Sequence, residues 1–64
     1  MISFTPEVKR ILLDAGCYME KQGRGDHETW VSPISNRKFN VDNKIKSRHT
    51  ANETLKQAGL NKHF

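Results

Sequence analysis

The sequence is poor in the features that mark secreted, membrane-spanning or disulfide-rich proteins. It contains a single cysteine, Cys17, which cannot form a disulfide within the chain. It has no apolar run long enough to cross a bilayer, and it lacks the charged and apolar segments of a secretory signal. With 64 residues it also lacks the bulk for a deep enclosed pocket, because a domain of this size buries only about 60% of the surface of its unfolded chain. These absences predict one reduced, soluble domain over residues 1–64, in the cytoplasm and without a membrane partner.

Positive charge is what the sequence has in excess. Eleven Lys and Arg residues against seven Asp and Glu residues give a formal net charge of +4. A polyanionic partner binds to such a surface with release of counterions. The charge alone fits RNA, DNA, a membrane surface or an acidic protein, so it narrows the class of partner without choosing one.

The N-terminal segment has the apolar spacing of a helix that packs on one side. We expect Thr5 to cap this helix, Pro6 to fit its first position and Gly16 to end it. The apolar side chains recur at i, i+3, i+4 and i+7, which places them on one helical face. They are Val8, Ile11, Leu12 and Ala15.

A second helix is expected near the C-terminus, after a basic stretch at residues 43–49. Thr50 and Glu53 have the spacing of a capping box, in which two side chains bond to the backbone at the start of a helix. Leu55 and Ala58 follow on one face, and Gly59 marks the end.

Three segments between the helices have strand character, at residues 17–22, 27–32 and 37–42. Residues 23–26 supply the turn between the first two. In the third segment, Phe39 and Val41 alternate with polar residues and share one face. In the second, Trp30 and His27 lie on opposite faces, and periodicity does not say which is inward. We favour Trp30 inward, with His27 on the exposed face or at its rim.

The predicted order is helix, three antiparallel strands, helix. An antiparallel sheet can keep one face wet, so the usual α+β arrangement places both helices on the other face. We expect this arrangement here, with one face of the sheet open.

Two stretches of the chain resemble a known family. The sequences GCYMEKQGRGDHETW and IKSRHTANETLKQAGL look like those of the HicA (YcfA-like) toxins of bacterial and archaeal toxin–antitoxin modules, and the resemblance covers nearly the whole chain. It implies a fold like that of the double-stranded-RNA-binding domain, ribosome-independent cleavage of mRNA and a HicB-type antitoxin as partner. The family's Gly-Asp-His motif falls on Gly25, Asp26 and His27, which implies that His27 is catalytic. The family's Val-Pro-x-His stretch is replaced by residues 41–44, VDNK.

RNA cleavage needs little from a protein besides a base and positive charge. The 2′-hydroxyl is the nucleophile, so a base that works near neutral pH and cations around the phosphate are sufficient. Histidine has an unperturbed pKa of about 6.5, which makes His27 the candidate general base. Gly25 has no Cβ and lets an RNA backbone approach closely. The cations expected to hold the phosphate are Arg24 in the turn and Lys44, Lys46 and Arg48 in the basic stretch.

Each candidate also has a plainer interpretation. A histidine at a strand edge is often only a solvated polar residue, and Asp26 can serve the turn alone or orient the imidazole of His27. His49 is a candidate general acid or merely a residue that flanks the helix. Glu28 is interpreted as a surface residue. Cys17 and the three histidines are too scattered to form a zinc site, so we expect no metal and no cofactor.

Two other classes of function fit the same sequence. The chain can be a non-catalytic RNA-binding module that reads A-form shape with its basic stretch and first helix. It can also be an interaction protein that uses the open sheet for a protein partner. Binding to nucleic acid weakens steeply with ionic strength, whereas an apolar protein contact does not.

Overall fold

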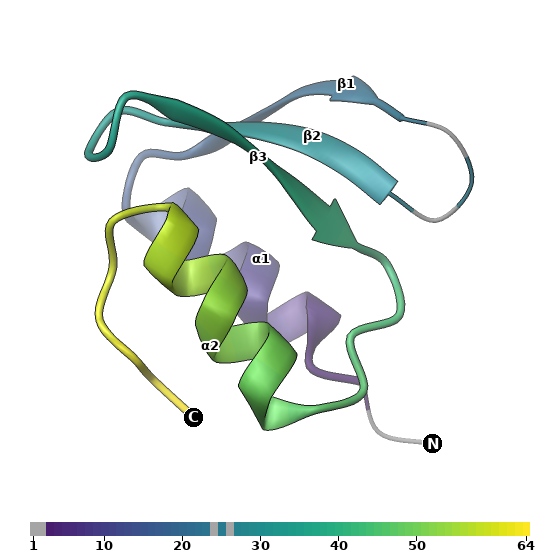
Figure 1. Cartoon of the computed structure of the whole chain (residues 1–64). Coiled ribbons are helices and arrows are strands. Elements are labelled where there is room, and N and C mark those ends of the chain that lie inside the picture. Colours follow the sequence, from purple (N-terminus) through teal and green to yellow (C-terminus); the bar gives the residue numbers. More distant parts are fainter. Residues whose placement is uncertain (1–2, 24, 26) are drawn as a thin grey trace.

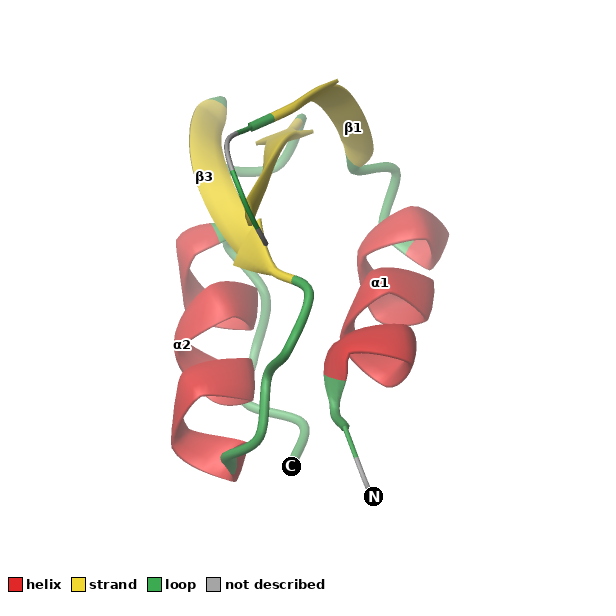
Figure 2. Ribbon diagram, turned by 90° about the vertical axis from the view of Figure 1, so that its right-hand side faces the viewer, coloured by secondary structure: helices red, strands yellow, loops and turns green. Residues whose placement is uncertain are grey.

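The computed structural model describes residues 3–23, 25 and 27–64, and it confirms the order α-β-β-β-α (Figure 1). The elements are α1 (Thr5–Asp14), β1 (Tyr18–Gln22), β2 (His27–Ser32), β3 (Arg37–Asp42) and α2 (Arg48–Gln57). The strands form one antiparallel sheet in the order β1-β2-β3. Both helices lie against the same face of this sheet, as Figure 2 shows from the side. Within the described residues, no helix has the length and apolar character needed to cross a membrane.

The start of α1 is fixed by a tertiary contact instead of the expected local cap. Phe4 is the N-cap residue and makes no side-chain cap bond, so Thr5 and Pro6 occupy the first two helical positions. The Thr5 hydroxyl donates to the carbonyl oxygen of Asp42 (3.0 Å) and accepts from the amide of Ile45 (2.9 Å). The prediction that Thr5 caps the helix is therefore wrong, because its hydroxyl joins α1 to the end of β3.

The pairing of β2 with β3 decides which face of the sheet is inward. Trp30 pairs with Phe39, and both are buried, as is Val41 on the same face. The expectation that Trp30 points inward is confirmed. His27 pairs with Asp42 at the opposite end of β2 and is exposed, so it lies on the open face as expected.

Strand β1 forms one edge of the sheet. It begins at Tyr18, one residue later than expected, because the amide of Cys17 bonds to the Leu12 carbonyl (2.9 Å) and closes the end of α1. All five residues of β1 are exposed, and its register with β2 shifts between Met19 and Lys21. Such an irregularity is common at sheet edges, where it twists the strand.

Helix α2 begins one turn before the position that the sequence pattern indicates. Its N-cap is Ser47, which has an extended backbone and whose hydroxyl accepts from the Thr50 amide at 3.0 Å. The predicted capping box of Thr50 and Glu53 is therefore wrong, since Thr50 lies inside the first turn. Ser47 precedes the same apolar face and provides an equivalent cap. As a consequence, the basic stretch ends within the helix.

The end of α2 is packed against the turn between β2 and β3. Gly59 has a φ of +82°, and the amide of Leu60 bonds back to the Leu55 carbonyl (2.9 Å), an arrangement typical of helix ends with glycine. The buried hydroxyl of Ser32 donates to the carbonyl of Ala58 at 2.6 Å. This bond satisfies one of the orphan carbonyls of the helix and fixes its position under the sheet.

The hydrophobic core lies between the inward face of the sheet and the two helices. It includes the predicted apolar faces of both helices and of β3, with Phe4, Ile11, Ala15, Leu60 and Phe64 partly buried around it. Its buried side chains are Val8, Leu12, Cys17, Trp30, Phe39, Val41, Ile45, Ala51, Leu55 and Ala58.

Replacing Gly59 by Ala should destabilise the protein by about 2 kcal/mol. The new Cβ costs about 1 kcal/mol through the positive φ alone, and it would lie 2.9 Å from Ile34 Cγ2 and 3.3 Å from Ser35 Cβ. Gly25 is a matched control, because it also has a positive φ (+63°) but nothing lies within 4 Å of its Cβ position. Urea unfolding should therefore give a larger loss for Gly59→Ala than for Gly25→Ala, and equal losses would contradict the packing argument.

Candidate functional site

His27 is the first residue of β2, and its imidazole is available to a ligand. The side chain is exposed, and it takes part in no hydrogen bond or ion pair with another described residue. Only its backbone is engaged, since its carbonyl accepts from the amide of Gly23 at 3.0 Å and closes the hairpin. The pairing with Asp42 places both side chains on the open face of the sheet. The imidazole therefore lies on the open face of the sheet, at the end of its central strand, where a large substrate can reach it.

The hairpin loop beside His27 contains the glycine of the sequence motif. Gly25 has a φ of +63°, a conformation that favours glycine, and the position of its missing Cβ is open. This geometry agrees with both interpretations of the residue, a turn glycine and a point of close approach. Arg24 and Asp26, the other two candidates in the loop, lie outside the described residues.

The β3–α2 connection, residues 43–47, begins beside His27. Lys44 and Lys46 are exposed on either side of Ile45, which is only 1% exposed and packs in the core. The amide of Lys44 donates to Asp42 Oδ1 at 2.8 Å, so the strand partner of His27 also orients the first turn of the connection. The sheet register thus brings Lys44 toward the histidine although 16 residues separate them in the sequence, from 28 to 43 inclusive.

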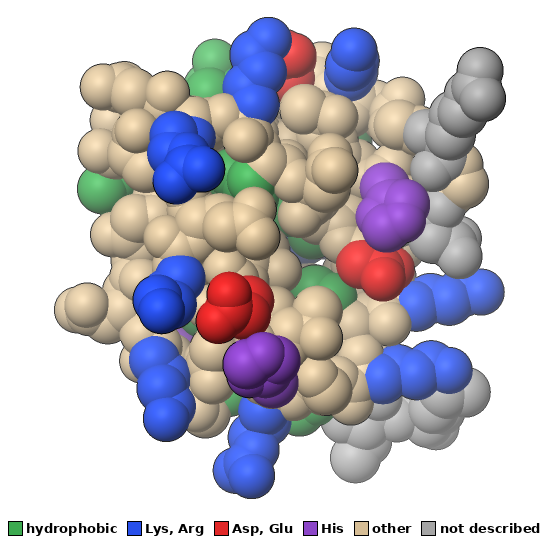
Figure 3. Space-filling model, in the orientation of Figure 1, with side chains coloured by type: hydrophobic (Ala, Val, Ile, Leu, Met, Phe, Trp, Pro, Cys, Tyr) green, Lys and Arg blue, Asp and Glu red, His purple; other side chains and the backbone are tan. Residues whose placement is uncertain are grey.

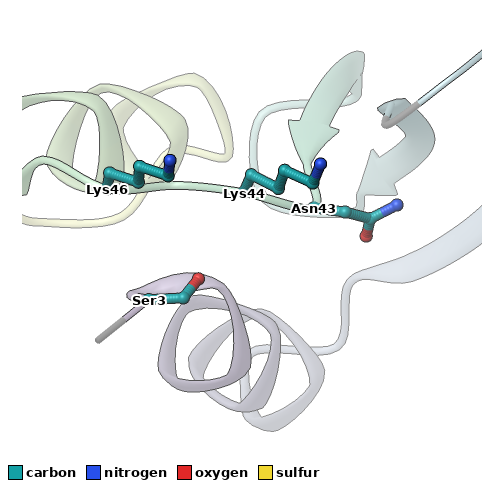
Figure 4. Close-up of a pocket in the computed structure, with 4 residues that line it drawn as sticks. All are labelled: Ser3, Asn43, Lys44 and Lys46. Atoms are coloured by element: carbon teal, nitrogen blue, oxygen red, sulfur yellow. The ribbon is translucent and has the colours of Figure 1, made fainter. Parts of the chain in front are cut away.

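A hollow of about 210 Å³ lies between the connection and the segment that precedes α1 (Figure 4). It is lined by Ser3 on one side and by Asn43, Lys44 and Lys46 on the other. Figure 4 shows the two lysine side chains extending from the same side of the connection. Two cations therefore border a concave surface that begins just after Asp42, the strand partner of His27.

Arg48 and His49 lie farther along, in the first turn of α2. In both ribbon views the connection leads away from the sheet before α2 begins, so this turn is at the far end from the start of β2 (Figures 1 and 2). The structure therefore does not bring His49 next to His27, as a general acid acting on the same bond would require. The Lys and Arg side chains are likewise spread over the face seen in Figure 3, with no single dense patch.

Glu28 is the residue that the sequence interpretation missed. Its side chain is only 13% exposed, and its carboxylate accepts from the indole nitrogen of Trp30 and from Lys9 Nζ, each at 3.0 Å. Lys9 Nζ also donates to Asn43 Oδ1 at 2.9 Å, which ties α1 to the β3–α2 connection. The interpretation as a surface residue is wrong. The sequence feature that predicts its burial is its position two residues before Trp30, which places both side chains on the inward face of the strand.

These contacts change the acidity of Glu28. The hydrogen bond from Trp30 and then that from Lys9 hold the pKa of the carboxyl below its ordinary value, because both donors favour the charged form. Burial opposes them and is the weaker influence. The carboxylate is therefore ionised at neutral pH and balances the charge of Lys9.

Groups of metal-ligating side chains are not found in the described part of the chain. No three His, Cys, Asp or Glu residues lie close enough together there to hold a metal ion. Cys17 is a free, buried thiol in the core.

Comparison with known proteins gives no relative for this chain. No family model matches it, and neither do any curated proteins or solved structures. The functional argument therefore depends on the residues themselves and on their geometry.

Replacing Glu28 by Gln should lower the free energy of unfolding at neutral pH by about 1–2 kcal/mol, since Lys9 loses its counter-charge. The folded pKa of Glu28 is depressed below 4.5. Its stabilising effect is thus complete above the unfolded pKa and disappears as the pH falls through the folded pKa.

Urea unfolding of both proteins between neutral and acid pH measures this effect. The difference between wild type and Glu28→Gln should shrink as the pH is lowered. Glu7→Gln is the control, because Glu7 pairs with Arg10 at the surface, with side chains 42% and 73% exposed. A difference for Glu28→Gln that stays constant down to acid pH would contradict the assignment.

Proposed function

We propose that this protein is a ribosome-independent mRNA endoribonuclease, the HicA-like toxin of a toxin–antitoxin module, acting in the cytoplasm and needing no metal or cofactor. The observation that supports it most is the position of His27. An exposed imidazole with no bond to another described residue lies at the start of the central strand β2, next to the loop of the Gly-Asp-His motif. A general base must be free to meet its substrate, and this side chain meets that requirement.

In the proposed reaction, His27 removes the proton of a ribose 2′-hydroxyl. The 2′ oxygen then bonds to the adjacent phosphorus, and the bond from phosphorus to the 5′ oxygen of the next nucleotide breaks. The leaving oxygen takes a proton from solvent, and the products carry a 2′,3′-cyclic phosphate and a 5′-hydroxyl. A single general base contributes roughly 10²- to 10⁴-fold, so cations must also stabilise the charge on the phosphate oxygens. Arg24 of the hairpin loop is the cation proposed for this role, and Lys44 of the connection is proposed to bind the next phosphate along the RNA.

The alternative of a non-catalytic RNA-binding module has less support. Such a module needs positive charge on its first helix to contact the RNA. The cations of α1 are Lys9 and Arg10, and they pair with Glu28 (3.0 Å) and Glu7 (2.9 Å) respectively. Both charges are therefore balanced within the protein. The open sheet face is compatible with a protein partner, and the antitoxin is the partner we propose for it.

His27→Ala should abolish RNA cleavage and growth arrest while leaving the fold intact, because no bond of the imidazole to a described residue is lost. We would compare induced expression of wild type, His27→Ala and His63→Ala, with circular dichroism to check the fold. His63 is the control, an exposed histidine next to the C-terminal residue. The RNA fragments from the wild type should end in a 2′,3′-cyclic phosphate. Free 3′-hydroxyl ends, or arrest by a folded His27→Ala, would reject the mechanism.

The proposed partner is an acidic HicB-type antitoxin, larger than this protein, that covers the part of the open sheet face around His27. Attraction between opposite charges would speed its association with a basic toxin. Tagged His27→Ala expressed in the native host should retain this protein, and the purified partner should suppress cleavage by the wild type. Recovery of no acidic protein larger than the toxin in that experiment would count against an antitoxin.

A further inference from the structure

Two lysines in the β3–α2 connection are displayed side by side. Lys44 and Lys46 are both exposed and extend from the same side of the chain, while Ile45 between them is buried (Figure 4). Since two residues of chain span at most about 7 Å, the two positive charges start from closely spaced points. This spacing is comparable to that of neighbouring phosphates along one nucleic-acid strand.

The backbone that carries these lysines is held from both sides. The Ile45 amide donates to the Thr5 hydroxyl (2.9 Å), and the Ile45 carbonyl accepts from the Phe4 amide (2.8 Å). Just before Lys44, the Asn43 side chain accepts from Lys9 at 2.9 Å. A chain bonded this way needs little reordering when a ligand binds, which favours affinity.

The geometry points to a pair of phosphate subsites on Lys44 and Lys46 for an RNA strand that runs from His27 along the β3–α2 connection. The connection begins directly after Asp42, the strand partner of His27, and leads away from the sheet. A strand whose reacting phosphate lies at His27 would therefore place its next phosphates along the connection. This inference rests on the proposed nuclease function, and it adds the path that the RNA strand takes across the protein.

The other side chains around the hollow act as supports in this arrangement. Asn43 Oδ1 accepts from Lys9, and the Asn43 amide helps to lower the pKa of Glu28, so this residue is turned toward the protein. The Ser3 hydroxyl accepts from the Thr5 amide (3.2 Å) and donates to the Ile45 carbonyl (3.3 Å). Donation to the phosphates is thus assigned to the lysine ammonium groups.

The test measures binding separately from cleavage. The ligand is a fluorescent single-stranded DNA oligonucleotide, which has the phosphates but not the 2′-hydroxyl, and its affinity is measured by anisotropy at several potassium chloride concentrations. Each phosphate contact on a single strand contributes about 0.7 to the slope of log K against log salt. We expect Lys44→Gln and Lys46→Gln each to reduce the slope by about 0.7 and the double variant by about twice that.

Lys56→Gln is the matched control. It removes the same charge from an exposed position in the last turn of α2, at the other end of that helix from the connection. It should leave the slope unchanged. The subsites would be overturned if the two connection variants had the same slope as Lys56→Gln. Absence of binding by the wild type would overturn them as well. Because Lys44 makes a further interaction in the folded protein, Lys46→Gln provides the independent check if Lys44→Gln alters the circular dichroism spectrum.

Kinetics on an RNA substrate separates this inference from the proposed function. Phosphates that flank the reacting one are bound alike in the ground and transition states, so Lys46→Gln should raise KM and leave kcat unchanged. A fall in kcat instead would place Lys46 at the reacting phosphate and overturn its flanking role. A salt slope reduced by about 0.7 in each lysine variant, together with no RNA cleavage by the wild type, would reject the nuclease proposal and support the subsites.

Discussion

The hydroxyl group of Thr5 lies where three parts of the chain meet. It donates to the last residue of β3 and accepts from the middle of the β3–α2 connection, while its own residue opens α1. Thr5 is buried, and its bond with the Ile45 amide is buried as well, so removing the hydroxyl would leave that buried amide unsatisfied. The Thr5 contacts fix the end of the sheet relative to the first helix. The position of Lys44 and Lys46 relative to His27 follows from that.

A second tie between the same elements is ionic. Lys9 of α1 joins Glu28 of β2 to Asn43 of the connection, on the inward side of the strand that presents His27 outward. Pairs of this kind contribute modestly to stability, because the cost of removing two charges from water offsets much of their attraction. Their geometry is specific, however. Thr5 and Lys9 are one helical turn apart in α1. Their contacts hold the end of the sheet and the connection on the side that faces the helices, and the opposite side is left to the solvent.

Periodicity was sufficient to predict the larger features of this fold. The order of elements, the inward face of β3 and the apolar faces of both helices follow from alternation and from the helical repeat. The errors have a common cause. Thr5 and the pair Thr50 and Glu53 have good local capping patterns, but a tertiary bond in the first case and a better-placed Ser47 in the second replaced them. Local patterns cannot reveal such competition.

The site was partly predictable for the same reason. The position of His27 on the open face follows from its place in an alternating strand. The partners of Glu28 come from α1 and from the connection, which the sequence places far from it, and only the folded chain shows them. The residues of the basic stretch are neighbours in sequence, which favours a single cluster of positive charge around one phosphate. In the structure, the connection separates Lys44 from Arg48 and His49 along its length.

The irregular register of β1 has a consequence for how copies of this protein meet. An edge strand with a regular backbone offers a row of unpaired donors and acceptors to any identical edge. Here the shift between Met19 and Lys21 interrupts that row, and the charged side chains of Glu20 and Lys21 stand beside the interruption. Two sheets would lose alignment after a few residues. The β1 edge is therefore a poor template for pairing with the same strand of another copy.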